Sequence, residues 1–278
     1  MSSEALKPLV LEILISTMYR KDFSFLEQMF PHKHYSNYNL LIINQTTDKD
    51  ILVSDLPNLK VINCFEFGVP KSRNLALTYA TGDICLMADD DIVYEPHMDK
   101  IILEAYQKHP GAAMISFEAV NEFRKPYALY EKVETHTKSS LHHIYTWVIS
   151  FNRKIYLEHN IVYSPFFGFG SPFQGSEEYV FLRKAYDKDL FMYHCPKTIV
   201  MHPEESSGRH MGRDSIVSAK SAVAYRFYGV FAYLWLIKYC FFVWRYKYIK
   251  THEIGSKFKI GLKAIATYKT LQRSGEMD

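Results

Sequence analysis

Three consecutive aspartates, Asp89, Asp90 and Asp91, are the clearest group in the sequence that could do chemistry. They follow a short apolar run, residues 84–88, of the kind that forms a buried strand. Ligands of open α/β sheets bind beyond the carboxyl ends of strands, and crowded carboxylates need a cation or hydrogen-bond donors to offset their repulsion. Such hard oxygen ligands suit Mg²⁺ or Mn²⁺ joined to a substrate phosphate. The alternative is a solvated acidic turn. Continued strand geometry would place Asp90 on the side opposite to Asp89 and Asp91.

Three other segments contribute candidate groups. Lys71 and Arg73 lie at the start of an expected helix, where they could receive a phosphate or nucleotide or be plain exposed charges. Glu177 and Glu178 lie in the first turn of another expected helix, where acids also simply stabilise the helix dipole. His202 ends an expected strand, as a metal ligand or as a hydrogen-bonded structural histidine.

The elements that must position these groups follow from the apolar pattern. Strands are expected at residues 10–15, 40–43, 61–64, 84–88, 112–117, 144–151 and 198–202, and helices at 23–30, 72–81, 96–109 and from 176 onward. The strands are apolar on both faces and alternate with helices, which predicts an α/β fold with a mostly parallel sheet flanked by helices.

The end of the chain has a different character. Residues 227–244 contain Lys238 as their only charged residue, and residues 207–278 carry 13 Lys/Arg and 4 Asp/Glu, a net charge of +9 that leaves −6 for residues 1–206. A run of this length is near the lower limit for a membrane-spanning helix, and its aromatic and basic ends suit a membrane interface. We expect peripheral attachment to anionic lipid on the inner face of the cell membrane through residues 209–278. A packed helical appendage or a homo-oligomer interface is the alternative.

Composition excludes several classes of protein. Of the 278 residues, 48% are hydrophobic and 23% charged, so the chain can form a packed core and is not globally disordered. Its four cysteines form no Cys-x-x-Cys pair, which argues against a disulfide scaffold or a zinc ribbon and for a reducing compartment. The N-terminal residues show no secretory-signal pattern, so a cytoplasmic location is expected. The acidic body opposes binding of nucleic acid.

The candidate groups occur in the order found in family 2 glycosyltransferases of the GT-A fold, which the chain resembles from about residue 9 to residue 208. The turn after the family's first strand is similar to Ile15-Ser-Thr-Met-Tyr-Arg20, and its Ala-Arg-Asn helix start is similar to residues 68–74. Its lead into the Asp motif is matched by Ala80-Thr-Gly-Asp83, and its Glu-Asp helix start by Glu177-Glu178.

The resemblance implies a metal-dependent, inverting transfer from a nucleotide-sugar donor, first of all a UDP-sugar, to a hydroxyl of a glycan or lipid-linked acceptor in surface polysaccharide synthesis. It implies a nucleotide site made of Thr17, Asn44, Gln45, Lys71, Arg73, Asp89 and Asp90. It implies a Mg²⁺ or Mn²⁺ site made of Asp91, Asp89 and His202. The catalytic base would be Glu178 when aligned from Pro196, or Glu177 when aligned from Arg183, and we prefer Glu178.

The same resemblance divides the chain into a catalytic domain, residues 1–208, and a basic helical region, residues 209–278. The donor half of the catalytic domain would be residues 1–118 and the acceptor half residues 119–208, with the segments 121–140 and 166–174 shaping the acceptor side.

The sequence departs from the family pattern in two places. The second strand of the family ends in Val-Asp-Asp-Gly-Ser-Thr-Asp, whereas this chain has Ile43-Asn-Gln-Thr-Thr-Asp48, so amides replace the carboxylates that contact the base. Amides carry donors and acceptors, so Asn44 and Gln45 can still bind a base, whose identity stays open. The catalytic position is Glu instead of Asp.

Three other functions are compatible with parts of this pattern. A sugar-nucleotide nucleotidylyltransferase would need a glycine-rich phosphate loop after the first strand, but residues 16–22 contain no glycine. The others are a degenerate GT-A protein that binds a lipid surface and a binding module directed by the basic tail.

Overall fold

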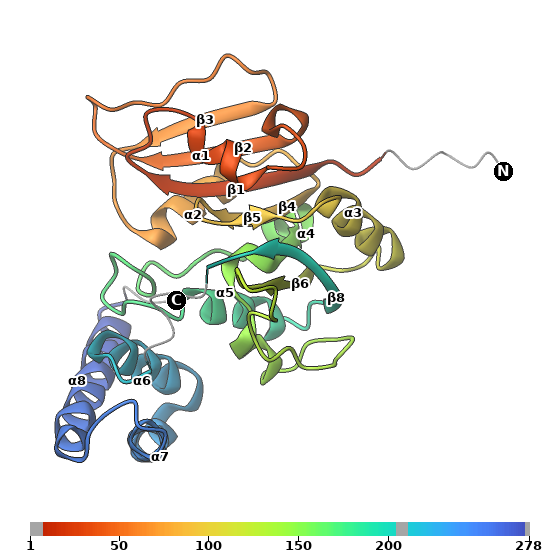
Figure 1. Cartoon of the computed structure of the whole chain (residues 1–278). Helices are drawn as coiled ribbons and strands as arrows, with labels where there is room; N and C mark the ends of the chain where they lie inside the picture. Colours follow the sequence, from red (N-terminus) through yellow and green to blue (C-terminus); the bar gives the residue numbers. More distant parts are fainter. Residues whose placement is uncertain (1–7, 204–210, 276–278) are drawn as a thin grey trace. The chain divides into compact units, whose positions relative to one another are not determined.

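The computed structural model describes residues 8–203 and 211–275 (Figure 1). Their eight-stranded sheet has the order β3-β2-β1-β4-β7-β6-β8-β5. Its first strands are β1 (Leu11–Met18), β2 (Asn39–Gln45), β3 (Leu59–Cys64) and β4 (Ile84–Asp89). They pair in parallel, so their carboxyl ends meet at one edge of the sheet. This is the edge at which ligands of such sheets bind.

The other half of the sheet is mixed. It consists of β5 (Val93–Tyr94), β6 (Met114–Val120), β7 (Ile149–Asn152) and β8 (Met192–Met201). β7 runs antiparallel to both β4 and β6, whereas β8 runs parallel to β6 and antiparallel to β5. The expected mostly parallel α/β fold is therefore confirmed, with an antiparallel strand inserted between two parallel groups.

Helices cover the sheet. They are α1 (Ser24–Met29), α2 (Val69–Tyr79), α3 (Met98–Lys108), α4 (Arg153–Glu158) and α5 (Glu177–Tyr186), with 3₁₀ turns η1 (Tyr35–Asn37), η2 (Ser140–His143) and η3 (Thr146–Val148). α1 and α3 share one apolar core with Ile13 and Ile15 of β1, while the alternate residue Leu14 is also fully buried. Both faces of the sheet are therefore covered, as the continuous apolar strands require.

Two strands begin five or six residues from their expected starts, whereas the bounds of the others differ by three residues or fewer. The strand expected at 144–151 begins only at Ile149, because residues 146–148 form the 3₁₀ turn η3. β8 begins at Met192, six residues before the expected start. Polar residues and Pro196 interrupt the apolar pattern that marks a strand in the sequence. At the same place the register of β8 against β6 is irregular, between Ser116 and Glu118.

The turn into β4 explains the segment Ala80-Thr-Gly-Asp83. The buried Glu12 carboxylate of β1 accepts hydrogen bonds from the backbone N–H groups of Thr81 (2.5 Å) and Gly82 (2.7 Å). A Cβ at Gly82 would lie 2.6 Å from the Glu12 Cβ, so this close approach needs glycine. Asp83 then accepts a hydrogen bond from the Val10 N–H (2.9 Å). These contacts fix β4, and the aspartates that follow it, beside β1.

The chain divides into two compact units. Of the described residues, the first unit comprises 8–67, 71–162 and 181–203 and contains the sheet; the second comprises 68–70, 163–180 and 211–275. The domain boundary expected between 208 and 209 lies outside the described residues. The loop residues 163–180, assigned in the sequence to the catalytic domain, group with the C-terminal helices.

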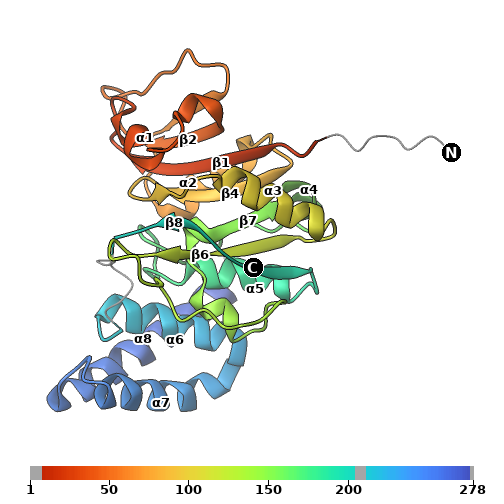
Figure 2. The ribbon, with the colours of Figure 1, turned by 45° about the vertical axis from the view of Figure 1, so that its right-hand side comes forward.

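The second unit contains three long helices, α6 (Asp214–Tyr228), α7 (Ala232–Arg245) and α8 (Ile254–Arg273), with 3₁₀ turns η5 (Gly229–Phe231) and η6 (Thr251–Glu253). The helices pack against one another (Figure 2). The apolar run 227–244 does not form one continuous helix, because Gly229 ends α6 with a positive φ of 54° and η5 follows.

Candidate functional site

Strand register brings several predicted site residues to the carboxyl edge of the sheet. Thr17 of β1 lies opposite Asn44 of β2, and Ser16 lies opposite Asp89, the last residue of β4. Asp90 and Asp91 follow in a turn, so strand geometry does not continue through the three aspartates. The expected alternation of their side chains is therefore replaced by three carboxylates with three different sets of partners.

Asp90 is held by Arg20, which in the sequence stands out only as the last residue of the segment Ile15–Arg20. The Arg20 guanidinium donates to one Asp90 oxygen from Nη2 (2.6 Å) and from Nε (2.8 Å). The buried Thr17 hydroxyl donates to the same oxygen. No local pattern marks this pair, since 70 residues separate its members. The cation offsets part of the repulsion among the aspartates.

The Asn44 side chain is bonded to the turn that follows β1. Its Oδ1 accepts the Arg20 backbone N–H (3.0 Å), while its amide donates to the Arg20 carbonyl (3.0 Å) and to Asn63 Oδ1 (3.1 Å). The side chain is fully buried and both amide protons are used within the protein, so no Asn44 donor remains for a base. Asn44 therefore positions Arg20, and its assignment to the nucleotide site stays a prediction.

Gln45 is bonded to one member of an aromatic pair, Tyr19 and Phe67, that no local sequence pattern indicates. The Gln45 side chain is buried, and the Gln45 backbone carbonyl accepts a hydrogen bond from the backbone N–H of Tyr19 (2.9 Å). Tyr19 has a left-handed backbone, with φ 54°, and its exposed ring lies 5.5 Å from the exposed ring of Phe67. A non-glycine residue in this conformation is often found at a functional site.

Asp89 pairs with Arg73, whose side chain is only 4% exposed, through an Nη2–Oδ1 contact of 3.3 Å. Lys71, by contrast, pairs with Glu66 at 2.6 Å on the surface. The hydrogen bond from Lys71 lowers the pKa of the Glu66 carboxyl. Of the two cations expected to bind nucleotide, the structure therefore joins Arg73 to the aspartates and directs Lys71 to another acid.

Asp91 is the aspartate that faces a histidine. Its side chain is 63% exposed, and its Oδ1 lies 3.6 Å from Nε2 of the buried His202. The His202 Nδ1–H donates to the Pro203 carbonyl (2.7 Å), because a carbonyl can only accept; this leaves a lone pair on Nε2 of the neutral ring. Trp147 stacks on the imidazole at 4.9 Å and Tyr127 meets it edge-on at 5.2 Å, two contacts that the sequence does not indicate.

The pair fits an open divalent-metal site. Within residues 8–203 and 211–275 no three His, Cys, Asp or Glu side chains converge as a closed metal site. Asp89, the third expected ligand, is engaged by Arg73. Mg²⁺ and similar ions commonly take only one or two protein ligands and complete their shell with phosphate oxygens and water. Asp91 and His202 offer an oxygen and a nitrogen of the required kinds.

Glu177 and Glu178 begin α5, as expected, and belong to the second compact unit. Glu177 is buried and Glu178 is partly buried. Gly168 of the preceding loop has φ +112°, and a Cβ there would lie 3.4 Å from both Cβ and Cδ of Glu177. The loop backbone therefore packs directly on the Glu177 side chain. The choice between the two acids as the base stays open.

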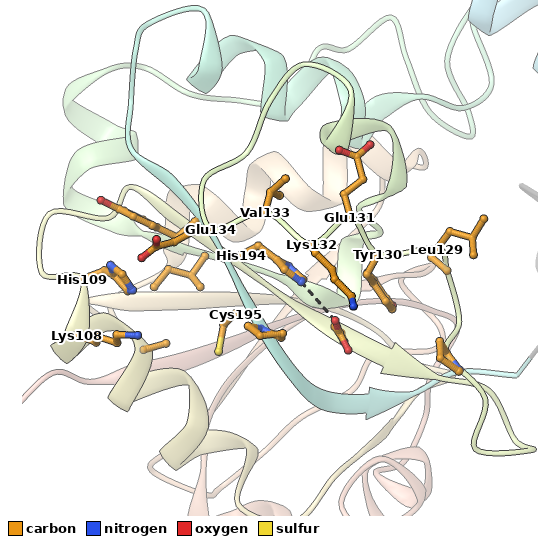
Figure 3. Close-up of a pocket in the computed structure, with 17 residues that line it drawn as sticks. Lys108, His109, Leu129, Tyr130, Glu131, Lys132, Val133, Glu134, His194 and Cys195 are labelled. Atoms are coloured by element: carbon orange, nitrogen blue, oxygen red, sulfur yellow. Dashed lines mark ion pairs between the residues drawn. The ribbon is translucent and has the colours of Figure 1, made fainter.

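A separate cavity of about 890 Å³ lies in the first unit (Figure 3). It is lined by the end of α3, by β6 and β8, and by segment 126–134. On its wall, His194 contacts Glu118 through Nε2 (3.4 Å) and Ser116 through Nδ1 (3.1 Å). Tyr127, in the same segment, contacts His202, so one segment borders both the cavity and the Asp91–His202 pair.

A buried polar chain continues behind the cavity. The Ser116 hydroxyl also contacts His136 Nε2 (2.8 Å), and His136 Nδ1 contacts the Ser140 hydroxyl (2.9 Å). Burial, and to a smaller extent the neighbouring His194, lowers the pKa of His136 to about 4. His136 is therefore neutral at physiological pH and serves as a hydrogen-bonding group in this chain.

Comparison with known proteins identifies the relatives of this arrangement. The model of glycosyl transferase family 2 matches residues 23–173, which is more than half of the chain. No protein of curated function matches the sequence.

The solved structures that are similar include S. aureus TarS 1–349 in complex with UDP-GlcNAc (TM-score 0.59, 12% identity, 96% of this chain and 92% of that chain). The same TarS fragment in complex with UDP gives a TM-score of 0.53, with the same identity and coverage. A longer S. aureus TarS gives a TM-score of 0.55 with 15% identity, and the match covers 78% of this chain and only 39% of that chain. At these identities the likeness establishes the fold, which confirms the expected GT-A architecture.

Proposed function

The chain belongs to glycosyl transferase family 2, and on this basis we propose that it transfers a sugar from a nucleotide-sugar donor to a hydroxyl group of an acceptor. The observation that carries the proposal is the 3.6 Å approach of Asp91 Oδ1 to His202 Nε2, two electron-pair donors that could share one cation, beside two aspartates already paired with arginines. This edge can receive a diphosphate with its cation, because Asp91 remains exposed.

The donor is proposed to be a UDP-sugar. The similar TarS fragment binds UDP-GlcNAc and UDP, and the exposed Tyr19–Phe67 pair offers aromatic surface for a base. Arg20 and Arg73 hold Asp90 and Asp89, and Thr17 completes the binding of Asp90. These residues keep the aspartates in place before the donor arrives, so less ordering is needed on binding.

Asp91 and His202 are the residues proposed to hold Mg²⁺ or Mn²⁺. A bound divalent ion supplies positive charge to the departing nucleoside diphosphate. The imidazole is oriented for this role by its hydrogen bond to the Pro203 carbonyl and by the Trp147 ring.

The proposed reaction is a direct displacement that inverts the anomeric carbon. The acceptor oxygen forms a bond to that carbon while the bond to the diphosphate breaks, and the hydroxyl proton passes to a carboxylate. We assign this base to Glu178, with Glu177 as the alternative. The proposed acceptor is a glycan or a lipid-linked glycan of surface polysaccharide synthesis, and the proposed compartment is the cytoplasm, in keeping with four free cysteines.

Calorimetry with UDP, GDP, CDP and dTDP, with and without Mn²⁺, tests the donor site. We expect one nucleotide to bind selectively and only with the metal, and Asp91→Asn to weaken that binding at least about tenfold, as loss of a charged metal ligand should. Glu178→Gln should leave the same binding unchanged, since the base acts on the acceptor. Asp189→Asn, an identical change at an exposed carboxylate whose left-handed backbone (φ 54°) suits asparagine, is the control. Equal binding by Asp91→Asn and wild type would contradict the proposed metal site.

A further inference from the structure

One side of α7 is covered by the other helices of its unit and the opposite side is not. Leu236, Cys240 and Val243 of α7 are buried in apolar clusters that also contain residues of α6 and α8. This packing fixes which side of α7 remains open. The open side carries large apolar residues from α7 and from η5.

We define the α7 apolar face as Val230, Phe231, Leu234, Ile237, Phe241 and Trp244. The first five side chains are between 56% and 70% exposed and Trp244 is 36% exposed. Leu234, Ile237, Phe241 and Trp244 follow the alternating spacing of three and four residues that places side chains on one stripe of a helix. Single exposed apolar residues are common, but a contiguous stripe of six apolar side chains marks an interaction site.

The charge around this face has one sign. Between Asp214 and Glu253 the sequence has six Lys/Arg and no Asp/Glu. Lys238, Arg245, Lys247 and Lys250 are exposed on or just beyond α7. Exposed Tyr246 and Tyr248 add aromatic rings with polar tips at the same end. An apolar stripe with amphipathic aromatics and flanking cations matches the boundary between the acyl chains and the anionic headgroups of a membrane.

We propose that the α7 apolar face inserts into the surface of an anionic lipid membrane, with α7 lying in the plane of the interface. The helical run Asp214–Arg245 is long and apolar enough to count as one candidate membrane span by length and composition. Gly229, however, ends α6, and α7 itself has 14 residues, a length of about 21 Å against the ~30 Å of a hydrocarbon core. α6 also buries its apolar residues inside the helical unit. These features favour a helix that lies on the membrane over one that spans it.

A partner of the α7 apolar face must meet two physical requirements. The partner must remove apolar surface from water, and it must accept a segment that has only positive charges. A second copy of the chain would meet the first requirement, but its cations would lie close to the same cations of the first copy and repel them. An anionic bilayer satisfies both.

Flotation of the full chain with lipid vesicles tests the proposal without any sugar donor, so its outcome is separate from that of the transferase assay. We expect recovery with phosphatidylcholine vesicles that contain phosphatidylglycerol and much lower recovery with phosphatidylcholine alone. The double variant Ile237→Gln/Phe241→Gln should partition about a hundredfold less, because each side chain contributes roughly tenfold when buried in the bilayer. Lys247→Gln and Lys250→Gln should each lower binding to the anionic vesicles by about fivefold.

The matched control is Val53→Gln/Leu157→Gln, which changes two similarly exposed apolar residues (66% and 55%) of the first unit and should float as the wild type does. Circular dichroism should show unchanged helix content in all variants, since the substituted side chains are exposed. Equal flotation of wild type and Ile237→Gln/Phe241→Gln, or equal recovery with both vesicle types, would overturn the proposal. So would a dimer in sedimentation that this double variant dissociates, because the face would then bind a second copy.

Discussion

His136 shows how a single buried group can set the pH dependence of stability. Its ring is held between the hydroxyls of Ser116 and Ser140, and burial lowers its pKa from 6.5 to about 4. In the unfolded chain the imidazole regains its ordinary pKa, so between pH 6.5 and 4 the unfolded state binds more protons than the folded state. The stabilisation is fully present above pH 6.5 and is lost as the pH falls towards 4.

We therefore expect His136 to account for about 3 kcal/mol of the stability lost between pH 6.5 and 4. Urea unfolding of His136→Gln across this range should show a pH dependence smaller by that amount, whatever its stability at neutral pH. His143→Gln removes an exposed imidazole from the neighbouring turn η2 and should retain the wild-type slope. A His136→Gln slope equal to that of wild type would contradict this account.

At the scale of elements, α8 contains two glycines in different surroundings, one packed against other helices and one not. Comparing them distinguishes the effect of helix packing from that of helix propensity. A Cβ at Gly261 would lie 2.3 and 2.7 Å from the Leu236 methyl groups and 2.8 Å from the Ser221 hydroxyl. Apart from its chain neighbours and its own helix backbone, Gly255 has no atom within 4 Å of the same position. Gly261 therefore permits α6 and α7 to approach α8, whereas Gly255 has no such packing role.

Gly261→Ala should destabilise the chain by about 1–3 kcal/mol through overpacking, partly offset by the better helix propensity of alanine. Gly255→Ala should instead stabilise it by about 0.5–1 kcal/mol, because alanine loses less backbone entropy in a helix. Chemical denaturation followed by circular dichroism compares the two variants. A shift of the same sign for both would show that α8 does not pack as described.

At the scale of the whole molecule, two buried cysteines report on the two compact units separately. Cys85 of β4 lies in the first unit and Cys240 of α7 in the second, and both side chains are buried. Burial raises the pKa of each thiol, so little reactive thiolate is present until the surrounding structure opens.

Alkylation at increasing urea, followed by mass spectrometry, should label Cys240 at lower urea than Cys85. The second unit is smaller, and exposed large apolar residues are more frequent in it for its length, so its opening should cost less free energy. Cys64, which is partly exposed, should react first and serves as an internal reference for the reagent. Simultaneous labelling of Cys85 and Cys240 would show that the two units unfold as one.

The sequence by itself determined the kinds of element and the place of the main motif. Continuous apolar runs identified β1, β2 and β4, because hydrophobic periodicity is a local property of the chain. The three aspartates could be recognised as a candidate site because they directly follow the apolar run of β4 in the sequence. The ordered motifs also indicated the family, which the match over residues 23–173 confirms.

Only the tertiary structure decided which groups meet. Arg20 reaches Asp90, and Trp147 stacks on His202, through strand pairings between residues far apart in the sequence. The tertiary structure also places the Arg20 carbonyl and Asn63 Oδ1 where they accept hydrogen bonds from the Asn44 side-chain amide. The side of α7 that stays open also depends on where α6 and α8 pack, which the composition of residues 227–244 does not contain. Partners at long sequence separation follow from register and packing, and neither is recorded in the local pattern of residues.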